Sequence, residues 1–442
     1  MKKNNGEQAK AIGLHNTNKP LLLRYIVIFV IGLCLGSVIC ILFLPRAGLL
    51  GSSTIFSPVP SPNSPDMKLV STFENGQRYK AGAYDVIVVS GTDREMGRQY
   101  GSLMKTEINS VYSIIINEGA QQGVTIQQIR NLSHDPELLL PVRMKEIFGG
   151  MAETSGLTED DIAIVYYGAS FYVSNLTQQN ECSFIATNGN YTTDGSMIVA
   201  RNYDLVDALS VFDPYYMLVV YKPNDGTNSV ATFNPAGMRP ETLMNNKGLF
   251  ISDNNGEESG GLAYRENRPD FISALFRFML NCSSMSEIDA DIEGTRPNAA
   301  VIVNAAGPDV AYSYEETVQR ISAISNLVRR SNSSGLLVAT NHFVDPSWGN
   351  QIPSPDTNSE TRYNNLVNQA TQNKGAIDAE KMTQIMDIMI DYGGAKMLHT
   401  EFWGTPYTTD HQVVYVPQSQ LLWIKVSDRS WQNVDLGTLF AD

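Results

Sequence analysis

Cysteine is scarce in this chain, with four in 442 residues. Cys34 and Cys40 lie in an apolar stretch near the N-terminus, which leaves only Cys182 and Cys282 in the rest of the chain. At most one disulfide could therefore form there. Cys282 ends a segment whose apolar spacing favours a buried helix, so we expect Cys282 to be a core thiol and Cys182 to be free.

Several functional motifs are absent as well. The sequence contains no Gly-x-Ser-x-Gly elbow and no glycine-rich phosphate-binding motif, so serine-hydrolase and nucleotide chemistry have no support. Its five histidines do not have the spacing of metal ligands. We therefore expect neither a metal ion nor another cofactor.

Basic residues are outnumbered by acidic residues beyond the N-terminus. The chain has 32 lysines and arginines against 46 aspartates and glutamates, for a net charge of −14. Several of the basic residues lie in the first 46 positions, so the remainder is more acidic than the whole. Because phosphate groups bind to basic surfaces, this balance argues against a nucleic acid as partner.

One segment has no charge at all. Tyr25–Leu44 is a run of 20 uncharged residues, the length that a helix needs to cross a bilayer, and no small-x-small cleavage site follows it. The basic residues before it predict a cytoplasmic tail at 1–24, and 25–44 is then a transmembrane helix that anchors the protein in the lipid bilayer as an uncleaved signal-anchor. Residues 45–67 are rich in Pro and Ser, which predicts an extended linker to an extracytoplasmic domain.

Beyond the linker, the pattern of apolar residues changes at Cys182. Residues 68–181 begin with a predicted strand at 84–92 and are otherwise rich in helical patterns. Short apolar runs separated by Gly, Asn and Pro then predict strands, with helical patterns again at 270–292 and 377–392. This mixture predicts an α+β fold, in which mostly antiparallel sheets are covered by helices.

The most informative stretch surrounds Cys182. This thiol opens an apolar strand, and Arg201-Asn202-Tyr203-Asp204 stands at the end of the next predicted strand. Such a hairpin would bring together a thiol, a guanidinium and a carboxylate, as a cysteine nucleophile requires. On their own, these residues also suit a buried cysteine in a hairpin that ends in a surface ion pair.

Further motifs follow in a fixed order. They are Asn245-Asn246-Lys247-Gly248-Leu249, Asn255, Val338-Ala339-Thr340-Asn341 and Ser359-Glu360-Thr361-Arg362-Tyr363. With the hairpin, they make the chain resemble the linear amide C–N hydrolases of the N-terminal-nucleophile (Ntn) superfamily, the choloylglycine hydrolases and penicillin V acylases, over about residues 68 to 440. The long segment before Cys182 is most similar to that of the self-processing acyltransferase and acid ceramidase branches.

The resemblance implies a four-layer α-β-β-α sandwich and six catalytic residues. These are Cys182, Arg201, Asp204, Asn255, Asn341 and Arg362. Cys182 would be the nucleophile, and autoproteolysis of the Glu181–Cys182 bond would free its α-amino group to act as the base. Asp204 would orient that amine and Arg201 would favour the thiolate. Asn255, with Asn254 as the fallback, and Asn341 would donate to the oxyanion, and Arg362 would complete the charge network.

The implied reaction is cleavage of a linear, non-peptide amide in a small N-acyl substrate through an acyl-Cys182 intermediate. Self-cleavage would leave an α chain that includes residues 68–181 associated with a β chain of residues 182–442. Two alternatives stay open. The acyl group could pass to an amine acceptor, or the chain could be a membrane-tethered binding protein without activity.

Overall fold

A computed structural model describes residues 67–441 apart from 176–180, 266, 319–325, 352–356 and 403. The expected cytoplasmic tail, transmembrane helix and nearly all of the linker lie outside these residues. In the part of the chain that is described, no helix is both long and apolar enough to cross a membrane. The segments before and after Cys182 belong to one unit, Pro58–Asp442.

Two β-sheets carry the fold, and the larger is sheet A. Its strand order is β1 (Lys68–Phe73), β2 (Gly76–Ala81), β3 (Tyr84–Gly91), β6 (Tyr216–Pro223), β7 (Val230–Pro235), β8 (Thr242–Asn245), β9 (Phe250–Asn255), β10 (Val301–Ala306), β11 (Ala311–Glu316) and β12 (Leu327–Ser331). Neighbouring strands pair antiparallel except β3 and β6, which are parallel.

Sheet B holds the candidate nucleophile. Its strand order is β13 (Leu336–Ala339), β4 (Glu181–Thr187), β5 (Ile198–Val206), β15 (Thr405–Val416), β16 (Leu421–Val426) and β17 (Gln432–Asp435), with β14 (Thr400–Phe402) paired to β15. All of these pairs are antiparallel. The predicted hairpin of two strands around Cys182 and Arg201 is therefore present as β4 and β5.

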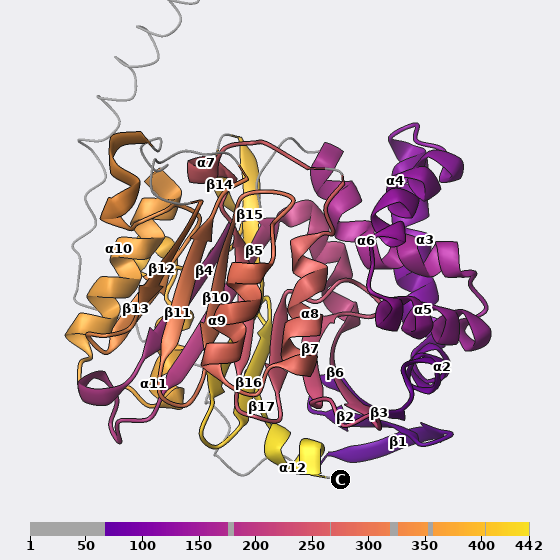
Figure 1. Ribbon diagram of the computed structural model, residues 1–442, viewed down its shortest axis with the longest axis horizontal. Helices are drawn as coiled ribbons and strands as arrows, with labels where there is room; N and C mark the ends of the chain where they lie inside the picture. The colour runs from indigo at the N-terminus through magenta and orange to yellow at the C-terminus, as the bar shows by residue number, and fades with distance from the viewer. Residues whose placement is uncertain are drawn as a thin grey trace, which may run out of the picture. The chain divides into compact units, whose positions relative to one another are not determined.

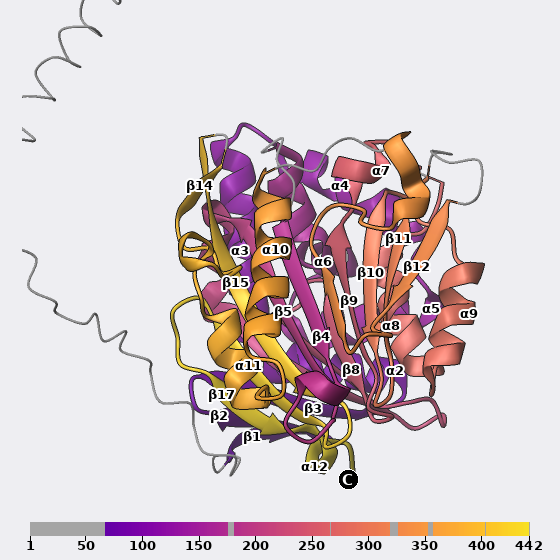
Figure 2. The same ribbon diagram turned by 90° about the vertical axis from the view of Figure 1, so that its left-hand side faces the viewer.

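Helices cover the outer face of each sheet (Figures 1 and 2). Over sheet A lie α2 (Asp93–Leu103), α3 (Lys105–Gln121), α4 (Ile126–Leu138), α5 (Val142–Ser155), α6 (Glu159–Asn175), α8 (Phe271–Asn281) and α9 (Met285–Gly294). Over sheet B lie α10 (Thr357–Gln372) and α11 (Ala379–Met386). Shorter elements are α7 (Glu257–Gly260), α12 (Leu436–Ala441) and the 3-10 turns η1 (Gly189–Tyr191), η2 (Asp207–Tyr215), η3 (Pro346–Gln351) and η4 (Ile390–Tyr392).

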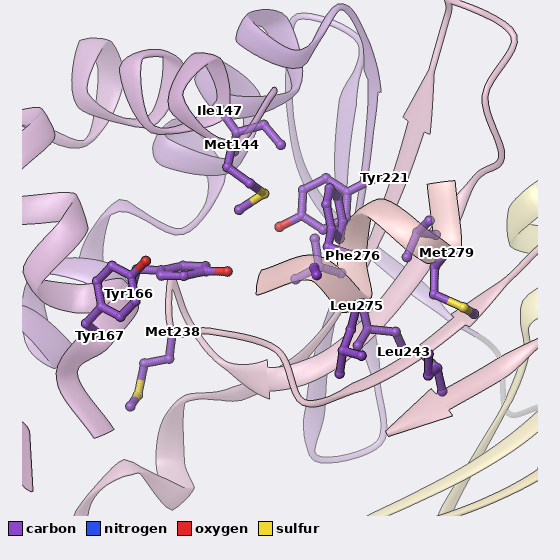
Figure 3. Close-up of a cluster of buried hydrophobic side chains, with 14 of the residues drawn as sticks. Met144, Ile147, Tyr166, Tyr167, Tyr221, Met238, Leu243, Leu275, Phe276 and Met279 are labelled. Carbon is purple, nitrogen blue, oxygen red and sulfur yellow. The ribbon is translucent and has the colours of Figure 1, made fainter. Parts of the chain in front are cut away.

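The core is arranged in three apolar layers, because successive residues of a strand face opposite sides of its sheet. Between the sheets, Leu218 of β6 and Val413 of β15 belong to one cluster. A second cluster joins the outer face of sheet A to its helices, and Figure 3 shows part of it, with Tyr166 and Tyr167 of α6 beside each other. A third joins sheet B to α10 and α11. The layer order is thus helices, sheet A, sheet B, helices.

Two glycines allow α2 and α5 to approach closely. A Cβ atom added at Gly97 would lie 2.1 Å from the carbonyl oxygen of Ile147, and one added at Gly150 would lie 2.1 Å from that of Arg94. Both distances are far inside van der Waals contact, and both partners are backbone atoms. No larger residue fits at either position unless the helices move apart.

The α+β class and the mostly antiparallel sheets expected from the sequence are confirmed. The helical pattern at 270–292 forms two helices, because the chain is extended at Cys282 and the side chain of Ser284 caps α9 by accepting from the backbone N–H of Glu287. Cys282 is buried beside this break, and both Cys182 and Cys282 are free thiols, as predicted.

Candidate active site

The hairpin β4–β5 sorts the site residues onto two faces of sheet B. Glu181 pairs with Asp204, and Phe184 pairs with Arg201. Since Phe184 packs between the sheets, alternation places Cys182 and Arg201 on that inner face as well. Glu181 and Asp204 then face the opposite side, which α10 covers (Figure 2). The strand alternation that the sequence shows is enough to produce this separation.

Three groups of Cys182 are each held by a different residue. Its Sγ lies 3.5 Å from Nη2 of Arg201 on β5. Its backbone N–H donates to Oδ1 of Asn341, just after β13, at 2.8 Å. Its carbonyl oxygen accepts from Nη1 of Arg362 on α10 at 2.5 Å. Residues that are 19, 159 and 180 positions away from Cys182 therefore converge on it.

Arg362 is the centre of the outer face. Its side chain is fully buried, and its guanidinium donates to the Glu181 carboxylate. It also donates to Oδ1 of Asn341 and to Oγ of Ser183, each at 2.9 Å. Its Nε donates to Oδ1 of Asn358, one turn earlier on α10, at 2.7 Å. Every nitrogen of this guanidinium is thus engaged, which fixes its position against β4.

Asn341 links Cys182 to β9. The hydroxyl of Ser359 accepts from the backbone N–H of Asn341 at 2.8 Å. The side-chain Nδ2 donates to the carbonyl oxygen of Asn255 at 3.1 Å, while Oδ1 accepts from Cys182 and Arg362. This pattern sets the orientation of the Asn341 amide, because its oxygen must face the two donors.

Arg201 lies in a buried polar ring on the inner face. Its Nη1 donates to the carbonyl oxygen of Glu241 and to Oγ1 of Thr242, each at 2.6 Å, and its Nη2 donates to the carbonyl oxygen of Asp253. Burial raises the pKa of the Cys182 thiol to about 12, although the positive charge of Arg201 opposes this shift. In the uncut chain the thiol is therefore protonated at neutral pH.

Asp204 is completely buried and only partly satisfied. Its Oδ1 accepts from the hydroxyl of Thr409 on β15. Its Oδ2 has no hydrogen-bond partner among the described residues and lies 3.9 Å from Nη1 of Arg362. Burial raises the pKa of Asp204 to about 7, although Arg362 opposes this. From the sequence, Asp204 is expected to orient the α-amino group of Cys182 after cleavage. In the uncut chain, the backbone N–H of Cys182 donates to Asn341 instead.

Asn255 lies at the end of β9, and its side chain is turned away from Cys182. Its Oδ1 accepts from the backbone N–H of Glu257 at 2.7 Å, and its Nδ2 lies 3.4 Å from the Glu257 carboxylate. Only its carbonyl oxygen contacts Asn341. The fallback residue, Asn254, is buried with its Nδ2 donating to the carbonyl oxygen of Thr340 at 2.9 Å, so its amide holds backbone in place.

Sequence reasoning missed several residues of this network. Ser183 and Thr409 hold Arg362 and Asp204, and Asn358 supports Arg362 from the same helix. Asn358 could have been found, because it precedes Arg362 by four positions on a helix. The others could not, since their partners lie far away along the chain.

No protein-family model matches the chain, and neither does any curated protein. Solved structures that are similar include a mutant and a variant of conjugated bile acid hydrolase from Clostridium perfringens, at 13% and 14% identity and a TM-score of 0.41 each. Penicillin V acylase from Agrobacterium tumefaciens is similar at 13% identity and a TM-score of 0.38.

Each comparison covers 59% of this chain, and they cover 94%, 95% and 93% of the respective solved chains. These enzymes are Ntn-hydrolases, the superfamily that the motifs resemble. At such TM-scores the likeness carries no weight for function, which therefore rests on the residues of the site.

Proposed function

We propose that this protein is a self-processing cysteine hydrolase of the Ntn type that cleaves a linear, non-peptide amide bond in an N-acyl substrate. One observation carries the proposal. The thiol, the amide nitrogen and the carbonyl oxygen of Cys182 are each held by a different predicted residue, namely Arg201, Asn341 and Arg362. A core cysteine needs no such set of partners.

Self-cleavage is the first step of the proposed mechanism. Sγ of Cys182 attacks the carbonyl carbon of Glu181, the thiol proton passes to the leaving amide nitrogen, and a thioester replaces the peptide bond. Water then hydrolyses the thioester, which releases the carboxyl group of Glu181 and restores the thiol. Cys182 is left with a free α-amino group.

That amino group explains why cleavage matters. The uncut thiol has a pKa of about 12 and is a poor nucleophile at pH 7. An α-amino group has an ordinary pKa near 8, so at neutral pH a fraction of it can accept the thiol proton. The thiolate would then attack the carbonyl carbon of the substrate amide, the amine would leave with a proton, and water would release the acyl group from Cys182.

Both proposed oxyanion donors have their side-chain N–H groups bonded elsewhere in the uncut chain. Asn341 contacts Cys182 through its acceptor Oδ1, while its Nδ2 donates to the carbonyl oxygen of Asn255. The side chain of Asn255 is bonded to Glu257. A donor of this kind is worth about 3–4 kcal/mol in the transition state. We assign the role to both residues, each of which would have to turn its Nδ2 toward the oxyanion after cleavage.

The place of action is part of the proposal. The uncharged run Tyr25–Leu44 and the basic residues before it support a single-pass anchor, with the N-terminus in the cytoplasm and the hydrolase outside it. A small N-acyl amide is the proposed substrate, and the α and β chains are proposed to remain associated after cleavage.

Intact mass and N-terminal sequencing of the purified full chain test the proposal, with Cys182→Ala as the control. We expect a new N-terminus at Cys182 in the wild type alone. The cleaved protein should then hydrolyse N-acyl amides, and an excess of added amine shows whether acyl transfer competes with hydrolysis. An uncut wild type whose Cys182 also fails to react with a thiol-directed probe would refute the enzyme and leave the binding scaffold.

A further inference from the structure

A small cavity lies beside the candidate nucleophile. It measures about 30 Å³, which is room for a group about the size of a water molecule. Tyr203 forms one wall, and this residue is paired with Cys182 across β4 and β5. The ring of Tyr203 also lies 4.7 Å from the guanidinium carbon of Arg201. Tyr203 therefore links the cavity wall to the pair of strands that carries Cys182 and Arg201.

Aromatic rings make up much of the wall. Tyr166, Tyr203, Phe212, Tyr216 and Phe233 all line the cavity. Tyr166 of α6 is labelled in Figure 3, together with Met238, which also lines it. The faces of such rings carry partial negative charge and attract cations.

The two unsatisfied polar atoms on the wall are both acceptors. Oδ1 of Asp410 and Oδ1 of Asn234 have no hydrogen-bond partner among the described residues, and the two side chains are 1% and 5% exposed. The amide of Asn234 cannot simply be reversed, because its Nδ2 donates to the carbonyl oxygens of Pro235 and Met238 at 2.9 and 2.7 Å. Oδ1 of Asn234 therefore lacks a donor, and so does Oδ1 of Asp410 whenever that carboxyl group is ionised.

Asp410 owes its position to a β-bulge. On β15, Thr409 pairs with Asp204 and His411 pairs with Tyr203, so Asp410 is an extra residue between two neighbouring pairs. A bulge re-aims the side chain of the inserted residue, and bulges are common next to active sites. Here the insertion places a carboxyl group on the cavity wall, beside the strand that carries Arg201 and Asp204.

The charges around Asp410 are mostly negative. The titratable and charged groups that act on it or line the same cavity are Asp204, Asp207, Asp213, Tyr166, Tyr203, Tyr216, His411, Arg239 and Glu241. Burial and three of these carboxylates raise the pKa of Asp410 far above its ordinary value, and burial lowers that of His411. Arg239 is already bonded to Asp270 at 2.6 Å and to Glu241 at 3.4 Å.

We propose that this cavity binds a cationic ammonium group of the substrate, with Asp410 and Asn234 as its acceptors and the aromatic rings around it. The inference rests on the proposed function and narrows its substrate class to N-acyl amides that carry an ammonium group. Asp410 is a specificity-determining residue rather than a catalytic one. On binding, the carboxylic acid of Asp410 gives its proton to the solvent, and the resulting carboxylate pairs with the ammonium ion.

The size and ligands of the cavity favour ammonium over a metal ion. Metal ions such as Ca²⁺ take six or more oxygen ligands, and the described wall offers two unsatisfied oxygens. An ammonium group needs few acceptors and is stabilised by ring faces. A bound water that donates to both oxygens is the competing occupant, and the experiment separates the two.

Calorimetry with methylammonium tests the site without any need for catalysis. The full chain carrying Cys182→Ala is titrated in two buffers that differ in ionisation enthalpy, with methanol and potassium chloride as the neutral and metal-ion probes. We expect methylammonium alone to bind, with release of about one proton. Adding Asp410→Asn should lower the affinity at least tenfold and abolish proton release. Glu401→Gln, the same acid-to-amide replacement at an exposed site, should do neither.

Substrate selection gives a second readout in the cleaved wild type. The ratio to measure is kcat/KM for an ω-amino-acyl nitroanilide divided by kcat/KM for its ω-hydroxy counterpart. Asp410→Asn should lower this ratio at least tenfold. A merely structural role would lower both values together. Equal methylammonium affinity with and without Asp410→Asn, or binding of methanol as strong as that of methylammonium, overturns the ammonium site. Because the calorimetry uses an inactive chain, the loss of all hydrolysis would overturn only the proposed function.

Discussion

Replacing Arg362 by methionine should be among the most costly single changes in the uncut chain. The substitution removes the positive charge beside the Glu181 carboxylate, which is 1% exposed, and takes donors from Asn341 and Ser183. Removing one partner of a buried ion pair costs about 3–5 kcal/mol, because the remaining charge loses its counter-charge without regaining water. We expect a loss of this size in the free energy of unfolding.

A double-mutant cycle isolates the pair. The chain from Pro58 onward, with Cys182→Ala to keep it uncut, is unfolded in urea at pH 7 as Arg362→Met, as Glu181→Gln and as the double variant. Glu181→Gln alone should cost less, because Arg362 keeps its other acceptors and lies 3.9 Å from Asp204. The double variant should be more stable than the sum of the two changes predicts, by about 2 kcal/mol.

Lysine at position 362 provides the matched control. It keeps the charge but not the planar fork that reaches four side chains and the carbonyl oxygen of Cys182. The loss in the free energy of unfolding should be smaller for Arg362→Lys than for Arg362→Met. Additive losses within about 0.5 kcal/mol, or a loss below about 1 kcal/mol for Arg362→Met, would show that the buried network does not hold β4 to α10.

Three further predictions concern single residues. Burial raises the pKa of Asp204 to about 7 in the folded chain, so Asp204 should make the uncut chain lose about 1.4 kcal/mol of stability per pH unit as the pH rises from about 4 to 7. Burial raises the pKa of Asp213 and Asp253 as well, so Asp204→Asn should lessen the slope of stability against pH in urea unfolding without abolishing it. Asn341→Ala should slow self-cleavage about a hundredfold, because it removes the acceptor that positions the N–H of the bond to be cut, whereas Asn364→Ala on the exposed side of α10 should not. The uncut fraction over time measures both rates, and equal rates would remove Asn341 from the mechanism. Gly150→Ala should cost about 1–3 kcal/mol, because its Cβ would meet the backbone of α2, whereas Gly294→Ala, which has open space around it, should cost nothing measurable in the same assay.

The part of the site that depends on local pattern was predictable. Alternation of apolar residues defines β4 and β5, and the register of an antiparallel hairpin then fixes which residues share a face. Cys182 and Arg201 could therefore be placed together from sequence. The motif order supplied Asn341 and Arg362, and the structure brings both into contact with Cys182.

What the sequence could not predict depends on packing between distant elements. Asn255 is a local exception, because its Oδ1 accepts from the backbone N–H of Glu257 only two positions later, a contact that asparagine commonly makes. The bulge at Asp410, by contrast, could not be predicted. An inserted residue shifts the alternation of apolar and polar residues along β15 by one position, and this shift leaves no recognisable sequence pattern. The unsatisfied oxygens of Asp410 and Asn234 become visible only when the walls of the cavity are assembled.

The state of Asp204 connects these observations to the proposed cleavage. In the uncut chain, Oδ2 of Asp204 has no hydrogen-bond partner among the described residues. Asp204 pairs with Glu181 across β4 and β5, so its carboxyl group lies next to the bond to be cut. Cleavage creates an amine on Cys182 that can carry a positive charge beside this carboxylate, which should lower the pKa of Asp204 and raise that of the amine. The cleaved wild type should therefore lose less stability between pH 4 and 7 than the uncut chain does. If the cleaved and uncut chains lose stability alike over that range, Asp204 does not receive the new amine.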